Sequence, residues 1–299
     1  MNISFAQQVT NKTQRLQHAF TVDVEDWYHG AIDEEIKITA ERRLHYGLGS
    51  LLELLAEYKI RGTFFWLGQA AFDNRHLVKQ VTQAGHEIAC HGWFHEYVYS
   101  MSPQKFRKDT KRAQEFLADL TGKPIIAYRA PYFSITRKSL WALDILAELG
   151  FHYDSSIFPT NNWRYGIPDY EPKIQEIHTP AGSIYEIPLS IRPILGHNIP
   201  ISGGAYFRLY PYALTKSNFL RAERNNCSVI FYIHPWELDP DHPPVSLSWK
   251  EQLTHNINLR STNIKLQQLL LDFSFVTLSE VLNNHLSNHH QSKALIGFD

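Results

Sequence analysis

The sequence predicts an α/β fold, and the simplest architecture that fits it is a single (β/α) barrel. Short apolar runs alternate with amphipathic segments along the chain, a pattern typical of parallel strands covered by helices. Reactive side chains stand where several of the apolar runs end, and in an α/β barrel these strand ends share one catalytic face. A chain of 299 residues, 43% of them hydrophobic, is long enough to bury the core of one such barrel.

Apolar runs predict the strands, beginning with Ala-Phe-Thr-Val-Asp-Val, which becomes acidic at its C-terminal end. Short runs of this kind are typical of strands that are buried in a parallel sheet. The expected strands are 19–24, 60–67, 86–90, 125–128, 153–154, 183–189 and 228–234.

Amphipathic segments between these runs predict helices. Ser102 followed by Pro103 marks a helix start, because serine caps the first turn and proline suits the first helical position. Gly85, Gly122 and Gly150 each stand where a helix should end. The expected helices are 48–58, 75–84, 102–120 and 136–149.

Composition narrows the class of protein. The 29 basic and 30 acidic residues give a net charge of −1, which offers no electrostatic footprint for nucleic acid or anionic lipid. No stretch approaches the roughly 20 apolar residues of a membrane span. The N-terminus lacks the basic start and apolar run of a signal peptide. Cys90 is expected to be a small buried residue in a reducing compartment rather than a partner of Cys227, so we expect a cytoplasmic protein.

The chain shows no internal repeat and no low-complexity linker. We therefore expect residues 1–17 to be an N-terminal leader, 18–285 to form one domain, and 286–299 to be a polar tail.

His91 and His95 stand four residues apart within Ala-Cys-His-Gly-Trp-Phe-His-Glu. Two imidazoles at this spacing can bind one metal ion from a single turn of chain. A carboxylate from the first strand would complete a two-His, one-carboxylate set and leave a position for water, as in catalytic metal sites. With 16 histidines a chance pair at this spacing is expected, so its meaning depends on the surrounding motifs.

The acidic stretch Asp23-Val24-Glu25-Asp26 can supply two roles. One carboxylate would bind the metal, and another would accept a proton from the attacking water. Asp23 and Glu25 would share a strand face, whereas Asp26 joins that face only if the chain turns after the strand. The alternative is a solvated acidic turn.

Two further strand ends carry candidate catalytic groups. Arg129 could hold the base carboxylate through a bidentate contact, and the backbone N–H of Tyr132 could face a developing oxyanion. His234 could protonate a departing amine, with a carboxylate such as Asp154 raising its pKa. The alternatives are a surface arginine before a turn and a buried structural histidine.

Aromatic residues gather beside these motifs. Most should serve packing, but a sugar ring stacks well on such faces, so some could line a glycan groove. Tyr132, Trp93 and Trp236 are the candidates for substrate contact.

The order of the motifs resembles that of the polysaccharide deacetylases, the NodB-type carbohydrate esterases of family four. The corresponding motifs are Thr21-Val-Asp23, His91-x-x-x-His95, Arg129-x-Pro131-Tyr132, the segment around 141–154, and Ile233-His234. Stretches such as Tyr-Ile-His-Pro-Trp-Glu-Leu-Asp-Pro and Gly-Gly-Ala-Tyr-Phe-Arg-Leu-Tyr-Pro are similar to a subgroup of exopolysaccharide deacetylases linked to the PEP-CTERM/exosortase system.

This resemblance implies a distorted (β/α) barrel that hydrolyses an N-acetyl group on a GlcNAc-type sugar. Asp23 matches the base, His91 and His95 the metal ligands, Arg129 the residue that orients the base, and His234 the acid. The family's first motif has two adjacent aspartates, but here Val24 intervenes. The third ligand is therefore Glu25 or Asp26, and we prefer Asp26 as the more compact ligand.

The implied cofactor is a divalent metal, for which zinc suits the ligand set and cobalt, manganese or nickel are alternatives. The expected partner is an N-acetylated carbohydrate, and the oligomeric state is not indicated. Two other functions remain open: an amidohydrolase acting on a small amide, and a barrel that binds glycan without turning it over.

Overall fold

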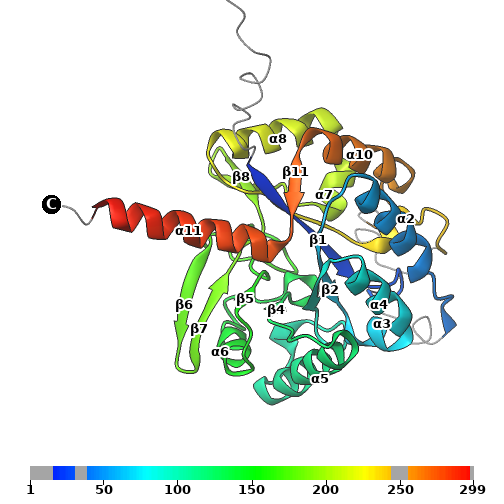
Figure 1. The fold of residues 1–299 in the computed structure, drawn as a ribbon, viewed down its shortest axis with the longest axis horizontal. Coiled ribbons are helices and arrows are strands. Elements are labelled where there is room, and N and C mark those ends of the chain that lie inside the picture. Colours follow the sequence, from blue (N-terminus) through cyan, green and yellow to red (C-terminus); the bar gives the residue numbers. More distant parts are fainter. Residues whose placement is uncertain (1–15, 31–38, 244–254, 297–299) are drawn as a thin grey trace, which may run out of the picture.

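A curled sheet organises the fold of this computed structural model, which describes residues 16–30, 39–243 and 255–296 (Figure 1). All neighbouring strands are parallel except the last pair, β7 and β6. The strand order is β10 (Ile230–Ile233), β1 (Gln17–Val24), β2 (Thr63–Trp66), β3 (Glu87–Cys90), β4 (Ala127–Tyr128), β5 (Tyr153–Asp154), β7 (Gly182–Glu186) and β6 (Gln175–Thr179), and β11 (Ser274–Val276) pairs with the start of β1.

The sheet forms an incomplete barrel, so the predicted α/β class and distorted barrel are confirmed. The gap between β7 and β10 is spanned by irregular backbone rather than by a regular strand. Leu189 N donates to Ile157 O, Ser190 Oγ accepts from Ile230 N at 2.9 Å, and Ser202 O accepts from Tyr232 N at 2.7 Å. These contacts draw the two sheet edges together around one interior.

Helices cover the outside of the sheet, as the amphipathic segments predicted (Figure 1). The α-helices are α2 (Leu44–Glu57), α3 (Gly68–Asp73), α4 (Arg75–Gln83), α5 (Pro103–Thr121), α6 (Trp141–Glu148), α7 (Gly204–Leu209), α8 (Tyr212–Arg224), α10 (Leu259–Asp272) and α11 (Leu278–Ile296). Short 3₁₀ turns lie at η2 (Val98–Ser100), η3 (Pro131–Phe133) and η4 (Pro235–Leu238). The expected signals at α5 are present, because Ser102 Oγ accepts from Lys105 N and Gly122 closes the helix at φ 66°.

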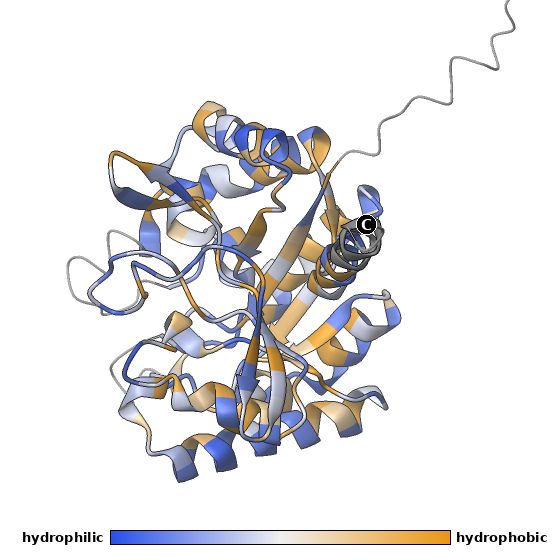
Figure 2. Cartoon of the chain, turned by 90° about the vertical axis from the view of Figure 1, so that its left-hand side faces the viewer, coloured by the Kyte–Doolittle hydropathy of each residue, from blue (hydrophilic) through white to orange (hydrophobic). Residues whose placement is uncertain are grey.

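Successive side chains along a strand pack into two different clusters, one on each face of the sheet. In β2, Phe64 and Trp66 pack against the helices, whereas Phe65 joins the cluster inside the curl of the sheet. The same alternation in β1 puts Phe20 and Val22 on the helical side. Figure 2 shows the result, apolar strands surrounded by helices with hydrophilic outer faces. Asp23, one residue beyond Val22, is thereby directed into the interior.

The prediction missed the second half of the fold in several places. A separate hairpin, β8 (Ile191–Ile194) with β9 (His197–Pro200), and the helices α7, α8 and α10 had no expected counterpart. Most of the predicted tail is helical, because α11 continues to Ile296 and extends away from the body (Figure 1). The predicted leader falls mainly on residues 1–15, outside the described residues.

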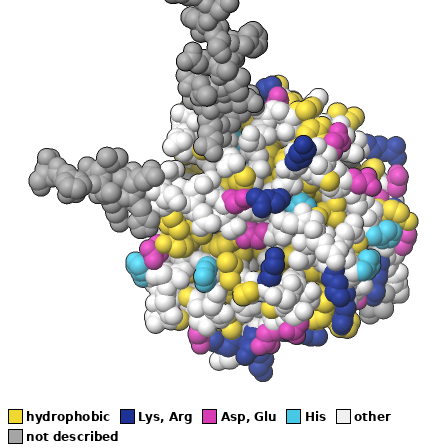
Figure 3. Space-filling model, viewed as in Figure 1, with side chains coloured by type: hydrophobic (Ala, Val, Ile, Leu, Met, Phe, Trp, Pro, Cys, Tyr) yellow, Lys and Arg dark blue, Asp and Glu magenta, His cyan; other side chains and the backbone are white. Residues whose placement is uncertain are grey.

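Surface charge and the apolar character of the helices can be compared with the expectations from composition. On the face drawn in Figure 3, basic and acidic side chains are interspersed rather than segregated. Within the described part of the chain, no helix has the length and apolar character needed to cross a membrane. Cys90 and Cys227 are both free, and Cys90 is buried as expected.

Candidate active site

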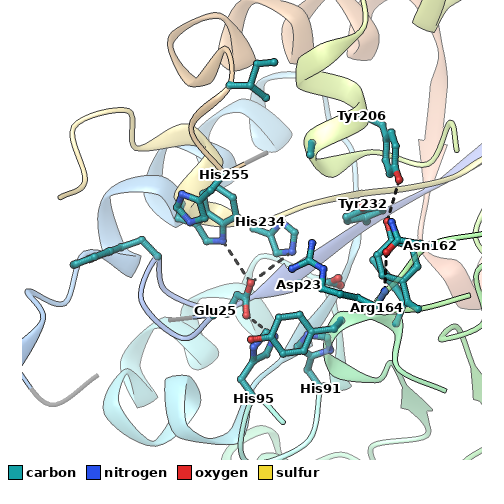
Figure 4. Close-up of a pocket in the computed structure, with 18 of the residues that line it drawn as sticks. Asp23, Glu25, His91, His95, Asn162, Arg164, Tyr206, Tyr232, His234 and His255 are labelled. Carbon is teal, nitrogen blue, oxygen red and sulfur yellow. Dashed lines mark hydrogen bonds and ion pairs between the residues drawn. The ribbon is translucent and has the colours of Figure 1, made fainter. Parts of the chain in front are cut away.

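Four of the predicted site residues meet where strands end. Asp23 lies near the end of β1, His91 follows β3, Arg129 follows β4 and His234 follows β10. All except Arg129 line one pocket of about 500 Å³, and Arg129 lies buried directly beneath it. Figure 4 shows the side chains of Asp23, His91, and His234 directed towards this common space.

Arg129 orients Asp23, as the sequence suggested, although the contact is single rather than bidentate. Its Nη1 donates to Asp23 Oδ1 at 2.7 Å and to Thr21 Oγ1 at 2.8 Å. Its Nε and Nη2 donate to the carbonyl and hydroxyl of Ser155. The guanidinium also lies over the ring of Phe65, 4.2 Å from the centroid. A buried arginine, each nitrogen of whose guanidinium donates at least one hydrogen bond, thus fixes one oxygen of Asp23.

The third group beside the histidine pair is Glu25. Ligand atoms of Glu25, His91 and His95 all lie within 4.8 Å of one another, and Glu25 Oε2 is 2.7 Å from His95 Nε2. His91 Nδ1 lies 2.8 Å from Arg129 O, and a proton on Nδ1 donated to this carbonyl leaves Nε2 as an electron-pair donor. Apart from the ion-pair contact with His95, Glu25 Oε2 is buried without a hydrogen bond. These three groups fit a divalent metal ion.

The preference for Asp26 over Glu25 needs correction, because the structure does not bring Asp26 to the histidines. Its Oδ1 accepts from Trp27 N at 2.9 Å, and its Oδ2 accepts from Arg43 N and Leu44 N at 2.8 and 3.0 Å. Arg43 and Leu44 begin α2. Asp26 therefore caps this helix from a distant part of the chain, which occupies both carboxylate oxygens.

The loop between the two histidines is shaped by a buried aspartate of α5. Asp109 accepts from Trp93 N at 2.7 Å and from Phe94 N at 3.1 Å. The Trp93 side chain turns away from the pocket and packs against Gly68, where a Cβ would lie 2.6 Å from the ring. The predicted substrate contact by Trp93 is therefore wrong, since the residue is 95% buried outside the pocket lining.

His234 has a different carboxylate partner from the one expected. Its Nδ1 lies 2.8 Å from Glu237 Oε1, and Glu237 is held in turn by Arg208, whose Nε donates to Oε2 at 2.6 Å. Glu237 and Arg208 are both buried. Asp154, the expected partner, instead accepts a hydrogen bond from Ser156 and lies outside the pocket lining.

Glu237 and Arg208 were missed by the sequence reasoning. Glu237 stands three residues after His234 in Ile-His-Pro-Trp-Glu, a spacing that a turn can close. Arg208 carries no comparable signal, because its contact with η4 depends on the position of α7.

The surroundings of His91 and His234 shift the pKa values of these two residues in opposite directions. Burial lowers the pKa of His91 to about 4, so the ring is neutral and able to donate an electron pair at pH 7. Burial also opposes the charged form of His234, but the hydrogen bond and charge of Glu237, with the charges of Glu25 and Asp23, raise its pKa above the usual value. Burial would raise the pKa of Glu25, but the neighbouring histidines, His95 first, lower it below its usual range. His234 is thereby favoured as a proton donor.

Tyr132 and Trp236 both line the pocket, as predicted. The Tyr132 ring lies 4.2 Å from that of His95, and its backbone is left-handed at φ 56°, a conformation that costs roughly 1–2 kcal/mol for a residue with a side chain. Trp236 stacks on His255 at 4.1 Å, and its Nε1 lies 3.5 Å from Glu25 Oε1. Trp27, another aromatic residue beside the acidic stretch, also lines the pocket. The rest of the wall was not foreseen, and it includes Asn162, Trp163, Arg164, Tyr165, Tyr206, Leu209 and Tyr232.

Comparison with known proteins agrees with this geometry. The profile of the polysaccharide deacetylase family matches residues 46–153. A second profile, a domain of unknown function named DUF3473, matches residues 155–283. In the fold these two regions share one sheet, because β1 pairs with β2 of the first region and with β10 and β11 of the second.

Curated proteins that are similar to part of this chain are named as peptidoglycan deacetylases. A peptidoglycan deacetylase of Helicobacter pylori is 30% identical over 111 residues, which cover 37% of each chain. The peptidoglycan-N-acetylglucosamine deacetylase PgdA of Listeria monocytogenes is 26% identical over 115 residues, covering 38% of this chain and 23% of the relative. The chain thus spans well under half the length of these two relatives.

Two solved structures share the overall fold. One is a Mycobacterium smegmatis protein classed as a polysaccharide deacetylase, with a TM-score of 0.62, 19% identity, and coverage of 92% of this chain and 93% of the other. The other is PuuE allantoinase, with a TM-score of 0.57, 14% identity, and coverage of 91% of each chain. At these identities the likeness concerns the fold.

Proposed function

We propose that this protein is a metal-dependent hydrolase that removes N-acetyl groups from an amino-sugar polysaccharide or its precursor and releases acetate. One observation carries the proposal. Glu25, His91 and His95 converge in the same pocket as an arginine-oriented carboxylate, Asp23, and a carboxylate-paired histidine, His234.

The metal site would be formed by one carboxylate and two neutral imidazoles, with zinc the favoured ion and cobalt, manganese or nickel as alternatives. A divalent ion bound there would polarise the acetyl carbonyl and lower the pKa of an attacking water. His91 is suited to this role because its Nδ1 is engaged by the carbonyl of Arg129.

The other residues would move and hold protons. Asp23 would accept a proton from the attacking water, since Arg129 binds one of its oxygens and leaves the other available. The backbone N–H of Tyr132 would stabilise negative charge on the acetyl oxygen. His234, whose protonated form is favoured by Glu237, would donate a proton to the departing amine.

The shape of the site favours a glycan over a small amide. Aromatic residues line the wall, and one of them, Trp163, is 71% exposed, so the pocket opens to solvent rather than closing around a small molecule. The likeness in fold to PuuE allantoinase keeps the amidohydrolase as the alternative function. A barrel that only binds glycan would have no need for the Arg129–Asp23 pair.

We also propose that the protein is cytoplasmic and takes part in exopolysaccharide formation. The free thiol of Cys227, which is exposed, is consistent with a reducing compartment.

Acetate release from N-acetylated oligosaccharides tests this function. We expect purified, zinc-loaded protein to release acetate, and we expect His91→Ala and Asp23→Asn variants to lose that activity. Circular dichroism would establish that both variants are folded. Unchanged acetate release by either folded variant would disprove the proposed chemistry, and hydrolysis of small amides alone would favour the alternative.

A further inference from the structure

The pocket extends beyond the groups needed for deacetylation. Most of its wall comes from residues 155–283, the region that matches the domain of unknown function. One stretch of this region, residues 158–167 between β5 and β6, contributes four successive lining residues, Asn162 to Tyr165. We call this stretch the rim loop.

The rim loop is closed and held in place by hydrogen bonds. Ile167 N donates to Phe158 O at 3.0 Å, which brings the two ends of the loop together. Thr160 Oγ1 donates to Asn198 O in β9 at 2.9 Å. Gly166 has a φ of 103°, and a Cβ there would lie 2.1 Å from Thr160 O, so the turn requires glycine.

The tip of the loop is anchored on its pocket side as well. Tyr165 stacks on Phe158 with ring centroids 5.6 Å apart, and its hydroxyl lies 3.1 Å from that of Tyr206 in α7. Asn162 Oδ1 accepts from Arg164 N at 2.9 Å. A loop ordered in this way can present side chains to a ligand at a low entropic cost.

Two side chains at the tip suit a second sugar that carries a negative charge. Trp163 is 71% exposed although it lines the pocket, and the Arg164 guanidinium lies 5.0 Å from its ring centroid. A broad aromatic face stacks on a sugar ring, and a guanidinium binds carboxylate or phosphate oxygens in a bidentate manner. Among the described residues that line the pocket, Arg164 is the only lysine or arginine.

The volume leaves room for this second unit. About 500 Å³ falls within the range of roughly 300–1,000 Å³ that is typical of pockets for drug-sized ligands. Glu25 follows β1, and His91 and His95 follow β3, whereas the rim loop follows β5, so the acetamido group and the neighbouring unit can be held by separate parts of the fold.

We propose that the rim loop is a specificity subsite for an anionic group on the unit next to the acetamido sugar. This inference rests on the proposed function and names its substrate class. The anionic group could be the carboxylate of a uronic acid within a polymer or the phosphate of an activated sugar precursor.

Binding and turnover of three matched probes test the subsite. The probes are a neutral N-acetylglucosamine oligosaccharide, an oligosaccharide of equal length in which N-acetylglucosamine alternates with glucuronate, and N-acetylglucosamine 1-phosphate. Affinity is measured by calorimetry on the Asp23→Asn variant, and kcat/KM for acetate release is measured on the zinc-loaded protein. The acidic probe that is preferred identifies the source of the negative charge.

We expect the Arg164→Gln variant to lower the ratio of acidic to neutral affinity by about 10-fold, the typical effect of one hydrogen bond to a charged group. Raising the salt concentration should lower the same ratio. Trp163→Ala should weaken oligosaccharide binding, and Trp163→Tyr should restore most of it. Arg137→Gln is the matched control, because Arg137 is an exposed arginine paired with Asp169 and lies outside the pocket lining.

The two proposals fail in different ways. Equal binding of neutral and acidic probes, or an unchanged ratio in Arg164→Gln, would overturn the subsite even if acetate is released. Arg164-dependent binding of an acidic probe without acetate release would overturn the deacetylase function and leave the subsite standing.

Discussion

At the scale of single residues, the site depends on which carboxylate occupies each position. The adjacent residues Glu25 and Asp26 have different roles, because Glu25 lies beside the histidines while Asp26 caps α2. The strand β1 ends at Val24, and Glu25 N already donates to Asp23 O in a turn. The sequence alone predicts that one of these two carboxylates points into the barrel. Which of them does so depends on the turn after β1, and that turn depends on the position of α2, which Asp26 caps.

The pairing of His234 with Glu237 leads to a mutational prediction. Glu237→Gln should lower kcat by about 100-fold, the lower end of a general acid's contribution, because the histidine loses the charge that keeps it protonated. It should also lower stability, since Arg208 would retain a buried charge without its partner. Steady-state kinetics with denaturant unfolding measure both effects.

Asp154→Asn provides the comparison for this prediction. Burial raises the pKa of Asp154, so a neutral amide is a fair substitute for it, and we expect kcat to remain within about threefold of wild type. A larger loss of kcat in Asp154→Asn than in Glu237→Gln would restore Asp154 as the partner of the acid.

At the scale of elements, α2 positions the turn that carries His234 and Glu237. Gly47 of α2 lies against η4 so closely that a Cβ would be 1.9 Å from Pro235 O, a backbone atom that cannot easily move aside. The ring of Trp93 likewise packs directly against Gly68 of α3, which has no Cβ in its way. Such close approaches explain why the expected pocket contact of Trp93 was wrong: the side-chain direction depends on a neighbouring helix.

Gly47→Ala should therefore destabilise the protein by at least about 1–3 kcal/mol, the usual cost of overpacking, and should lower acetate release by displacing η4. Gly49→Ala in the same helix is the control. Nothing lies within 4 Å of its added Cβ, so it should stabilise the helix by about 0.5–1 kcal/mol. Chemical denaturation of the two variants measures the difference, and similar effects of both would contradict the packing described for Gly47.

At the scale of the whole molecule, sequence reasoning recovered the central strands and their reactive ends. Asp23, His91, Arg129 and His234 could be placed because each follows a buried apolar run. The rim loop could not be placed, because an irregular segment leaves no periodic pattern, and the contact of Arg208 could not be placed because it depends on where α7 packs. The second region is nevertheless integral to the fold, since β10 supplies the strand that precedes the proposed acid.

Stability should depend on pH through buried histidines that are neutral in the folded protein. His18 packs among Phe219, Phe273 and Phe275, and burial lowers its pKa to about 4. The unfolded chain takes up a proton near pH 6.5, so this contribution to stability is complete above pH 6.5 and is lost as the pH falls towards 4. The loss amounts to about 3 kcal/mol for this one group.

The free energy of unfolding, measured from pH 7 to pH 4, tests this assignment. His18→Asn keeps an acceptor for Val229 N, which now donates to His18 Nδ1, but it cannot titrate. Its stability should fall less steeply with decreasing pH than that of the wild type. Parallel pH profiles for the two proteins would show that His18 does not contribute.

The most direct test of the central claim compares metal content and acetate release in Glu25→Gln and Asp26→Asn. Glu25→Gln should bind zinc at least about 10-fold more weakly and lose acetate release at limiting zinc, because the amide removes the charge of the proposed third ligand. Asp26→Asn should keep stoichiometric zinc and most of its activity, and lose stability at the start of α2. Wild-type zinc affinity in Glu25→Gln together with loss of zinc in Asp26→Asn would contradict the metal site proposed for this protein.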